Sequence, residues 1–157
     1  MRIRMANERD IPRLLDLLHQ VLELHACGRP DIFVSGTTKY GHEELLAILH
    51  NPDTPVLVLC DDADNVQGYA MCEIQNSQGA NMTDIRTLYL DDLCVDENCR
   101  GQQYGRKLYE AVREYGRSVG AYHVTLNVWS CNPSARQFYE AMGLKPMKTT
   151  MEDILQS

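Results

Sequence analysis

The stretch TLYLDDLCVDENCRGQQYGRKLYEAVREYGRSV, residues 87–119, predicts a strand, a tight loop and a helix in succession. Its first part is apolar except for Asp91 and Asp92, and the residues at 96–98 then turn the chain. Its last part, from about Gly105, repeats apolar residues at helical spacing, which predicts a helix with one buried face. Those residues are Leu108, Ala111, Val112, Tyr115 and Val119.

The loop between strand and helix, RGQQYG at 100–105, has the features of a phosphate-binding loop. A helix start leaves backbone N–H groups without partners and carries roughly half a positive charge. Gly101 and Gly105 allow the backbone to approach an anion closely. Full positive charges come from Arg100, Arg106 and Lys107. A glycine loop in this strand–helix context indicates anion binding more strongly than the glycines alone.

This loop resembles the cofactor-binding motif of the GNAT superfamily of N-acetyltransferases. The family pattern is Arg or Gln, two residues, Gly, one residue, then Gly or Ala. Arg100 and Gly105 fit it, whereas Gln103 stands where the family usually has glycine. The resemblance implies a loop wrapped around the pyrophosphate of acetyl-CoA. Gln103 in place of glycine affects how closely the backbone of the loop approaches the pyrophosphate. The implied cofactor contacts here are Leu93, Cys94, Val95, Arg100, Gly101, Gln102, Gln103, Tyr104, Gly105, Arg106 and Lys107.

A second motif follows at 132–144, NPSARQFYEAMGL. Asn132 is a good helix cap, Pro133 a good first residue and Gly143 a natural stop, so the residues predict a compact helix. The order Asn, Ala, Phe-Tyr, Gly-Leu also resembles the second GNAT motif, at the distance from the first that the family shows. The resemblance implies cofactor contacts by Asn132, Ser134 and Tyr139. It is strong over residues 85–151 and rests on element order alone before them.

The remaining chain mixes strands and helices. A helix with an apolar stripe from Ile11 to Leu22 is expected after Asp10, which can cap it; residues 25–30 end this helix and open a loop through Tyr40. Further elements are expected at 2–5, 43–49, 54–60, 67–74, 122–129 and 145–151, the third and fourth of these as a hairpin. The resemblance implies a single mixed α/β domain over residues 1–157 with a GNAT-like fold. Its mixed, mostly antiparallel sheet of six to seven strands would carry about four helices, with a parallel strand pair splayed at the cofactor site.

Composition excludes several classes of function. Among 157 residues, 44% are hydrophobic and 24% charged, which is ordinary for a globular protein. A net charge of −7 argues against a nucleic-acid binder. No apolar run suits a membrane span or a signal segment, so a cytoplasmic protein is expected. Six cysteines form no C-x-x-C pair, so no metal site is expected, and Cys60, Cys72 and Cys94 read as buried small hydrophobes.

Acetyl transfer to an amine sets chemical requirements that can be compared with these residues. An alkylamine with a pKa of about 10 must lose a proton before it attacks, so a general base is needed. The tetrahedral oxyanion needs a donor, which in the family is a backbone N–H of the central strand. The leaving thiolate needs an acid, and Tyr139 is expected in that role; the alternative is that Tyr139 only packs on its helix. Asn132 is expected to bind the cofactor, alongside or instead of a plain capping role.

Asp91 and Asp92 are the candidates for the base, and Asp91 also for acceptor binding. Side-chain alternation is expected to place them on opposite faces of the strand. The run LDDLCV at 90–95 resembles that of polyamine-acetylating members, whose acidic residues hold a cationic amine. The alternative is that both aspartates cap turns or pair with arginines. Asn127 stands where the branch that acetylates ribosomal-protein N-termini has a glutamate, so that branch's base is missing.

The loop after the first helix is expected to border the acceptor, with His25 and Arg29 as candidate contacts beside Asn127. His25 could serve as a base, although a lone histidine near a helix end is more often structural. The leading hypothesis is therefore an enzyme that acetylates a small-molecule or peptide amine. The resemblance also implies a homodimer as one form of the protein. The alternative is a domain that binds CoA as a sensor or scaffold without catalysis. A general nucleotide-binding domain is weakened by the absence of a GxGxxG or P-loop lysine pattern.

Overall fold

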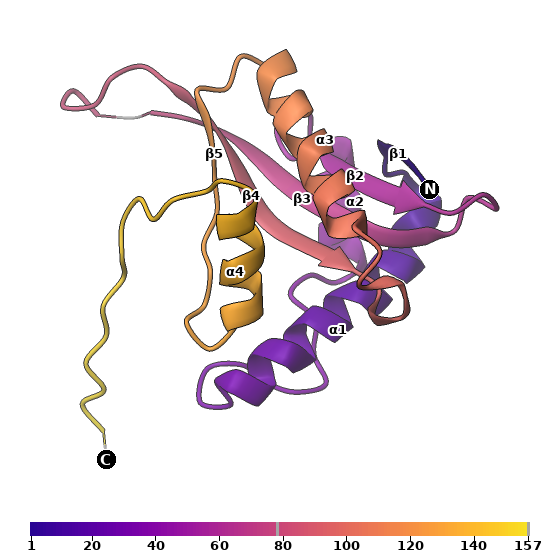
Figure 1. The fold of residues 1–157 in the computed structure, drawn as a ribbon, viewed down its shortest axis with the longest axis horizontal. Coiled ribbons are helices and arrows are strands. Elements are labelled where there is room, and N and C mark those ends of the chain that lie inside the picture. Colours follow the sequence, from indigo (N-terminus) through magenta and orange to yellow (C-terminus); the bar gives the residue numbers. More distant parts are fainter. Residues whose placement is uncertain (78, 157) are drawn as a thin grey trace. The chain divides into compact units, whose positions relative to one another are not determined.

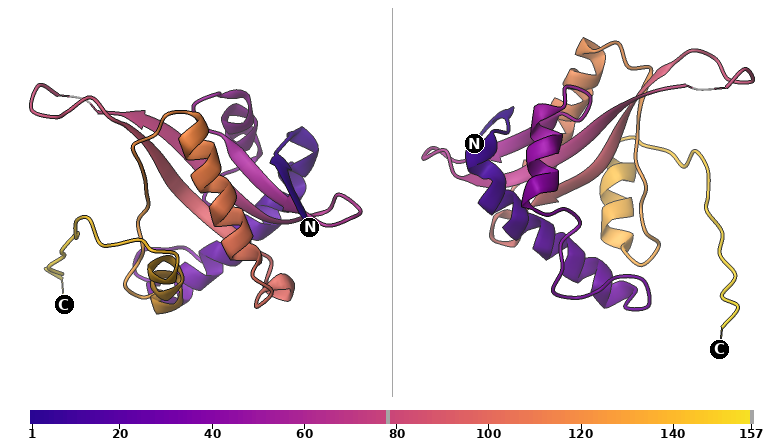
Figure 2. Two further views of the ribbon diagram at one scale, coloured as in Figure 1. Left: turned by 45° about the horizontal axis from the view of Figure 1, so that its top comes forward. Right: turned by 180° about the vertical axis from the view of Figure 1, so that it is seen from behind.

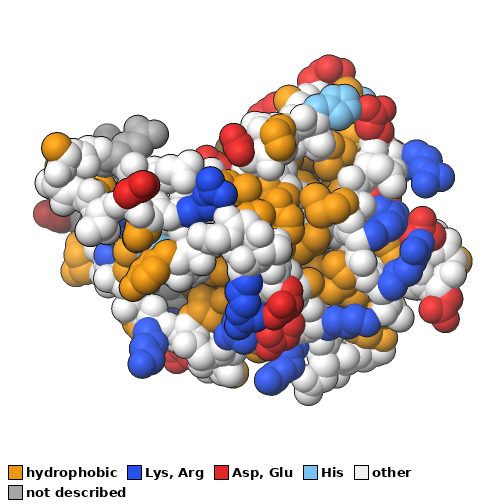
Figure 3. Space-filling model, turned by 90° about the horizontal axis from the view of Figure 1, so that it is seen from above, with side chains coloured by type: hydrophobic (Ala, Val, Ile, Leu, Met, Phe, Trp, Pro, Cys, Tyr) orange, Lys and Arg blue, Asp and Glu red, His pale blue; other side chains and the backbone are white. Residues whose placement is uncertain are grey.

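The computed structural model describes residues 1–77 and 79–156. The chain divides into two compact units, Met1–Asn127 and the residues from Val128 on, and each is described by itself. Within the described ranges, no helix combines the length and apolar character that crossing a membrane requires. On the face drawn in Figure 3, acidic and basic side chains are interspersed with hydrophobic ones.

The first unit is built on one mixed sheet in the order β1-β2-β3-β4-β5 (Figure 1). The strands are β1 (Arg2–Met5), β2 (Val56–Cys60), β3 (Val66–Asn76), β4 (Arg86–Val95) and β5 (His123–Thr125). The first four pair antiparallel, and β4 pairs with β5 in parallel. This confirms a mixed, mostly antiparallel sheet with one parallel pair. The described residues form five strands rather than six or seven, because residues 145–151 form no strand.

Helices cover both faces of this sheet. Helices α1 (Ile11–Gly28) and α2 (His42–His50) lie on one face, and α3 (Tyr104–Ser118) lies on the other (Figures 1 and 2). The centre of the apolar stripe of α1 is fully buried, since Ile11, Leu14, Leu17 and Leu18 are each at most 1% exposed. With α4 (Pro133–Ala141) of the second unit, the described chain has the expected four α-helices.

The start of α1 differs from the expectation. Asp10 makes no capping hydrogen bond to α1. Its carboxylate instead accepts from the backbone N–H of Asn7 and from Arg4, each at 2.8 Å. Asn7 and Asp10 thereby form a capping box around the short 3-10 helix Glu8–Asp10, which leads into α1. The prediction that Asp10 caps the long helix was therefore wrong, because the chain begins its helical path one turn earlier.

Strand β4 contains a bulge at the two aspartates. Met71 of β3 pairs with Asp92 and the next residue, Cys72, pairs with Leu90, so Asp91 has no cross-strand partner. An extra residue of this kind interrupts the alternation of side chains along a strand. In a regular strand, Leu88 and Cys94 would share a face, because an even number of positions separates them. Here Leu88 lies against Gly116 of α3, whereas Cys94 contacts the Leu17 carbonyl of α1. The bulge therefore exchanges the two faces of β4 partway along its length.

The second unit contains α4 and the C-terminal residues. Asn132 caps α4 by accepting from the Ala135 N–H at 3.3 Å. Gly143 ends it with a positive φ of 95°, and Leu144 N donates to the Tyr139 carbonyl at 3.0 Å. The predicted start and stop of this helix are therefore confirmed.

Candidate active site

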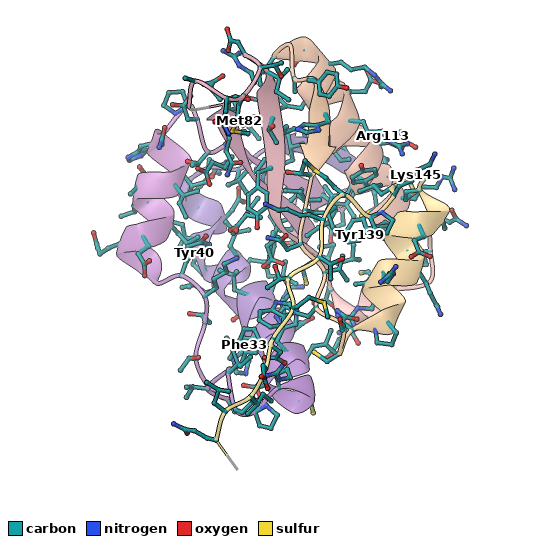
Figure 4. The ribbon with its side chains drawn as sticks, turned by 90° about the vertical axis from the view of Figure 1, so that its left-hand side faces the viewer. Phe33, Tyr40, Met82, Arg113, Tyr139 and Lys145 are labelled. Atoms are coloured by element: carbon teal, nitrogen blue, oxygen red, sulfur yellow. The ribbon has the colours of Figure 1, made fainter. Side chains whose placement is uncertain are left out.

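Asp91 at the bulge is held by two side chains from the loop between α1 and α2. Lys39 Nζ lies 2.9 Å from Oδ1, and the Tyr40 hydroxyl donates to Oδ2 at 2.6 Å. Figure 4 shows Tyr40 and Phe33 on this loop. Burial and the neighbouring Asp91 carboxylate raise the pKa of Tyr40, so its hydroxyl remains a donor at neutral pH. The loop predicted to border the acceptor thus contacts one of the predicted acidic residues directly.

Asp92 is held from inside the core. The Tyr69 hydroxyl donates to Asp92 Oδ2 at 2.6 Å, and Tyr69 itself is fully buried. Burial raises the pKa of Asp92, while the hydrogen bond from Tyr69 and the charge of Lys39 lower it in part. A carboxyl group with a raised pKa is a stronger proton acceptor once ionised, as a general base needs to be.

The two carboxylates lie on the same side of β4. Tyr69 belongs to the hydrophobic cluster beneath α1, and Tyr40 packs against that same cluster. Because these tyrosines hold Asp92 and Asp91 respectively, both carboxylates face the side of α1 and α2. The expectation of opposite faces was wrong, because it assumed regular alternation and the bulge interrupts it. The alternative reading of turn caps or arginine pairs also fails, since the partners are tyrosines and a lysine.

The edge of β4 opens just beyond Tyr89. The parallel pairing with β5 covers Thr87 to Tyr89 only, and no strand of the described chain pairs with β4 on that side afterwards. Leu93, Cys94 and Val95 lie along this open edge while pairing with β3 on the other. This agrees with the expected splayed pair. The Cys94 side chain is buried and burial raises its pKa to about 12, so only its backbone is suited to contact a cofactor.

The loop after β4 has the backbone of an anion site. Gly101 and Gln103 both adopt positive φ, 80° and 66°, and α3 then begins at Tyr104 without a side-chain cap. Gln103 thus takes the left-handed conformation that glycine adopts most easily, at the position where the family motif has glycine. Arg100, Gln102 and Arg106 are exposed around this helix start, and Gly105 lies in its first turn. Lys107 donates to the Met1 carbonyl.

Asp96 anchors this loop to α1 and was not singled out from the sequence. Its carboxylate accepts from Arg13 Nη2 at 2.5 Å and Gln20 Nε2 at 3.2 Å, and from the Asn98 N–H at 2.8 Å. Burial alone would raise the pKa of Asp96, but these hydrogen bonds outweigh it and lower the pKa to about 2. The signal available in the sequence was Asp96 two residues before Asn98, a pattern typical of a capped turn.

The other predicted acceptor residues have mixed surroundings. Arg29 forms a two-point ion pair with Asp31, at 2.9 and 2.8 Å. His25 stacks on Phe33 with ring centroids 5.1 Å apart, and burial followed by the charge of Lys39 lowers its pKa. Asn127 donates to the Tyr89 hydroxyl at 3.1 Å, where β4 and β5 diverge. The charge of Lys39 therefore acts on His25, whereas the guanidinium of Arg29 is paired with its neighbour Asp31.

Three predicted cofactor residues belong to the second unit. The Asn132 side chain caps α4 and also accepts from the Ser134 hydroxyl at 3.1 Å. Tyr139 packs edge-on against Phe138, with centroids 5.0 Å apart. The capping role of Asn132 is thus present, and the roles of Asn132, Ser134 and Tyr139 towards acetyl-CoA stay predictions.

Comparison with known proteins identifies the family. The model of the acetyltransferase (GNAT) family matches residues 18–144. The thialysine N-epsilon-acetyltransferase of Bos taurus is 27% identical, with 92% of this chain and 84% of that protein covered. A mutant of the BH1408 protein from Bacillus halodurans superimposes with a TM-score of 0.94 at 32% identity, over 99% of this chain and 100% of that one.

A more distant structure shares the fold. The glucosamine-6-phosphate N-acetyltransferase of Arabidopsis thaliana gives a TM-score of 0.70 at 22% identity, covering 99% of this chain and 98% of that one. With the family match spanning most of its length, the chain belongs to the GNAT family of acetyltransferases and is an acyltransferase.

Proposed function

We propose that this protein transfers the acetyl group of acetyl-CoA to a primary amine of a small molecule or peptide, by direct attack in a ternary complex. The observation that carries the proposal is the placement of Asp91 and Asp92 on one side of β4, each held by a tyrosine hydroxyl. Acidic groups so placed suit a cationic amine that must be held and deprotonated. We also propose that the two units form one acetyltransferase domain, since the family match spans residues from both.

The residues after β4 fit the diphosphate of acetyl-CoA. The uncapped start of α3 and the positive φ of Gly101 and Gln103 leave a backbone that can cradle an anion. Exposed Arg100 and Arg106 add charge beside it. Acetyl-CoA supplies the acetyl group as an activated thioester.

Asp91 and Asp92 have different roles, one in binding the acceptor and the other in accepting its proton. Asp91 binds the ammonium group of the acceptor, because its carboxylate lies beside Asp92 on the same side of β4 and its side chain is 19% exposed. Asp92 accepts the proton, because burial raises the pKa of its carboxyl group above the ordinary value for an aspartate. The neutral amine then attacks the thioester carbon, so that the C–N bond forms and the carbonyl oxygen becomes the tetrahedral oxyanion; the C–S bond breaks as this adduct collapses, and the second proton of the nitrogen passes to solvent.

Charge that develops during transfer also needs partners. Backbone N–H groups of the Leu93–Val95 segment stabilise the tetrahedral oxyanion. The open edge of β4 at this segment supports the assignment, because β5 pairs with β4 only at 87–89. The Tyr139 hydroxyl gives its proton to the departing thiolate. The bovine relative acetylates an ε-amine by its name, which supports a small acceptor with a terminal amine.

Calorimetry with acetyl-CoA and with CoA, followed by an amine panel read by thiol release, tests the proposal. We expect binding of both, and turnover with at least one primary amine. Gly105→Trp should abolish binding by filling the space at the start of α3, and Ser118→Trp, at the exposed opposite end of the same helix, is the matched control. Binding without turnover on any amine would contradict catalysis and favour a CoA sensor.

A further inference from the structure

Lys39 brings an ammonium group of the chain itself to the proposed acceptor site. Its Nζ lies 2.9 Å from Asp91 Oδ1, and Asp91 is the carboxylate proposed to hold the acceptor. A lysine side chain ends in a primary alkylammonium, the same chemical group as the proposed acceptor. An acceptor that binds Asp91 therefore meets a positive charge that is already in place.

The position of Lys39 is fixed by its neighbour and remains open to solvent. Tyr40 donates to the other oxygen of Asp91, so both oxygens are engaged from one dipeptide. The Lys39 side chain is 45% exposed while that of Asp91 is 19% exposed. Lysine carries three N–H donors, and Asp91 accepts from one of them. The ammonium can thus act on a molecule that enters from solvent.

We propose that Lys39 determines which charge class of amine the protein accepts, selecting against polycationic acceptors and in favour of amines that carry a carboxylate. The inference rests on the proposed function. Asp91 and Asp92 without Lys39 would offer two acidic groups to a diamine. With Lys39 in place, one of them is already neutralised and a second ammonium of the acceptor is repelled.

Lys39 distinguishes this site from that of the polyamine-acetylating members, which the LDDLCV run at 90–95 resembles. The acidic run alone suggests a site for polycations. The lysine comes from a loop distant in sequence, and only the fold places it on Asp91.

The test uses three acceptors of equal chain length and different charge: 1,5-diaminopentane, pentylamine and 5-aminopentanoate. For each, kcat/KM is measured at one pH with the native protein, Lys39→Gln and Lys39→Arg. In Lys39→Gln, we expect the ratio for diamine over pentylamine to rise about fivefold, and the ratio for 5-aminopentanoate over pentylamine to fall about fivefold. Lys39→Arg, which keeps the charge, should preserve the native order.

A matched control removes a positive charge elsewhere. Arg117 forms an exposed ion pair with Glu114 on α3, so Arg117→Gln should leave all three ratios unchanged. If Lys39→Gln changes kcat/KM by one common factor for all acceptors, Lys39 only stabilises its loop and the inference is wrong while the proposed function stands. If the native protein acetylates no amine, the proposed function fails and the inference fails with it.

Discussion

The hydroxyl of Tyr69 donates a 2.6 Å hydrogen bond to Oδ2 of Asp92. This bond places a neutral donor from the core directly on the proposed base. It lowers the pKa of Asp92, against the larger effect of burial, which raises it. Tyr69 therefore regulates how much of Asp92 is ionised at a given pH without touching the acceptor.

Tyr69→Phe should shift the acidic limb of the kcat/KM profile to higher pH. The carboxylate must be ionised to accept a proton, and loss of a hydrogen bond to the ionised form raises its pKa. Profiles of native and variant protein between about pH 5 and 9 measure the shift. Tyr122→Phe, at an exposed position, is the control and should leave the limb in place. An unchanged limb in Tyr69→Phe would show that Asp92 is not the base.

Asp92→Asn should lower kcat/KM by about 10²–10⁴-fold, the usual contribution of a general base. The amide keeps the shape of the side chain but accepts no proton. Asp62→Asn, in the exposed turn between β2 and β3, removes the same charge away from the site and should retain activity. Activity near the native level in Asp92→Asn, with the fold verified by circular dichroism, would transfer the role of base to another residue.

Gln103→Gly should stabilise the protein by up to about 1 kcal/mol, since relief of the left-handed conformation exceeds the entropy that glycine adds to the unfolded chain. Acetyl-CoA affinity should be retained or improved. Gln102→Gly, one residue earlier and not at positive φ, is the matched control and should destabilise slightly. Denaturant unfolding and calorimetry measure both effects. A loss of stability in Gln103→Gly would mean that its side chain makes a larger contribution than its backbone costs.

Asp96 should contribute stability that disappears in acid. Its pKa is lowered to about 2 in the folded protein, so the contribution is fully present above the unfolded value of 3.8 and is lost as the pH falls towards 2. At neutral pH this amounts to about 2 kcal/mol. Unfolding of native protein and Asp96→Asn should therefore differ at pH 7 and converge at pH 2. Asp53→Asn, at an exposed position, should follow the native curve throughout.

Tyr139→Phe should lower turnover by about 10²-fold while leaving CoA affinity nearly intact, because only the proposed acid is removed. Thiol release measures turnover, and calorimetry measures affinity. Phe138→Leu changes the neighbouring ring and tests whether packing of α4 alone accounts for the loss. Unchanged turnover in Tyr139→Phe would show that the thiolate takes its proton elsewhere.

Sequence reasoning predicted most of the architecture because the patterns that encode it are local. The apolar stripe of α1, the hairpin of β2 and β3 and the capped α4 each depend on residues within a few positions of one another. The expected strand at 145–151 was wrong: its apolar side chains Met147 and Met151 are 72% and 84% exposed, so the segment buries no apolar face. Strand β5 is also shorter than the apolar run that predicts it, because its pairing with β4 ends at Thr125.

The candidate site was only partly predictable, because its key contacts join distant segments. Asp91 and Asp92 stood out as charges within an apolar strand, but Lys39 lies 52 positions from Asp91 and Tyr69 lies 23 from Asp92. The bulge left no sign in the residue pattern, since either aspartate could be the extra residue. Only the register between β3 and β4 reveals that the two carboxylates share a side.

The same bulge divides β4 into two halves that pack against different helices. Before it, Leu88 belongs to the layer of α3; after it, Cys94 belongs to the layer of α1. A core substitution in the first half therefore changes the packing against α3, and one in the second half changes the packing against α1. Selection could therefore change the half of β4 that carries Asp92 for a new acceptor without disturbing the packing of α3. A single inserted residue thus allows the acceptor side of the strand to evolve independently of the side that packs on α3.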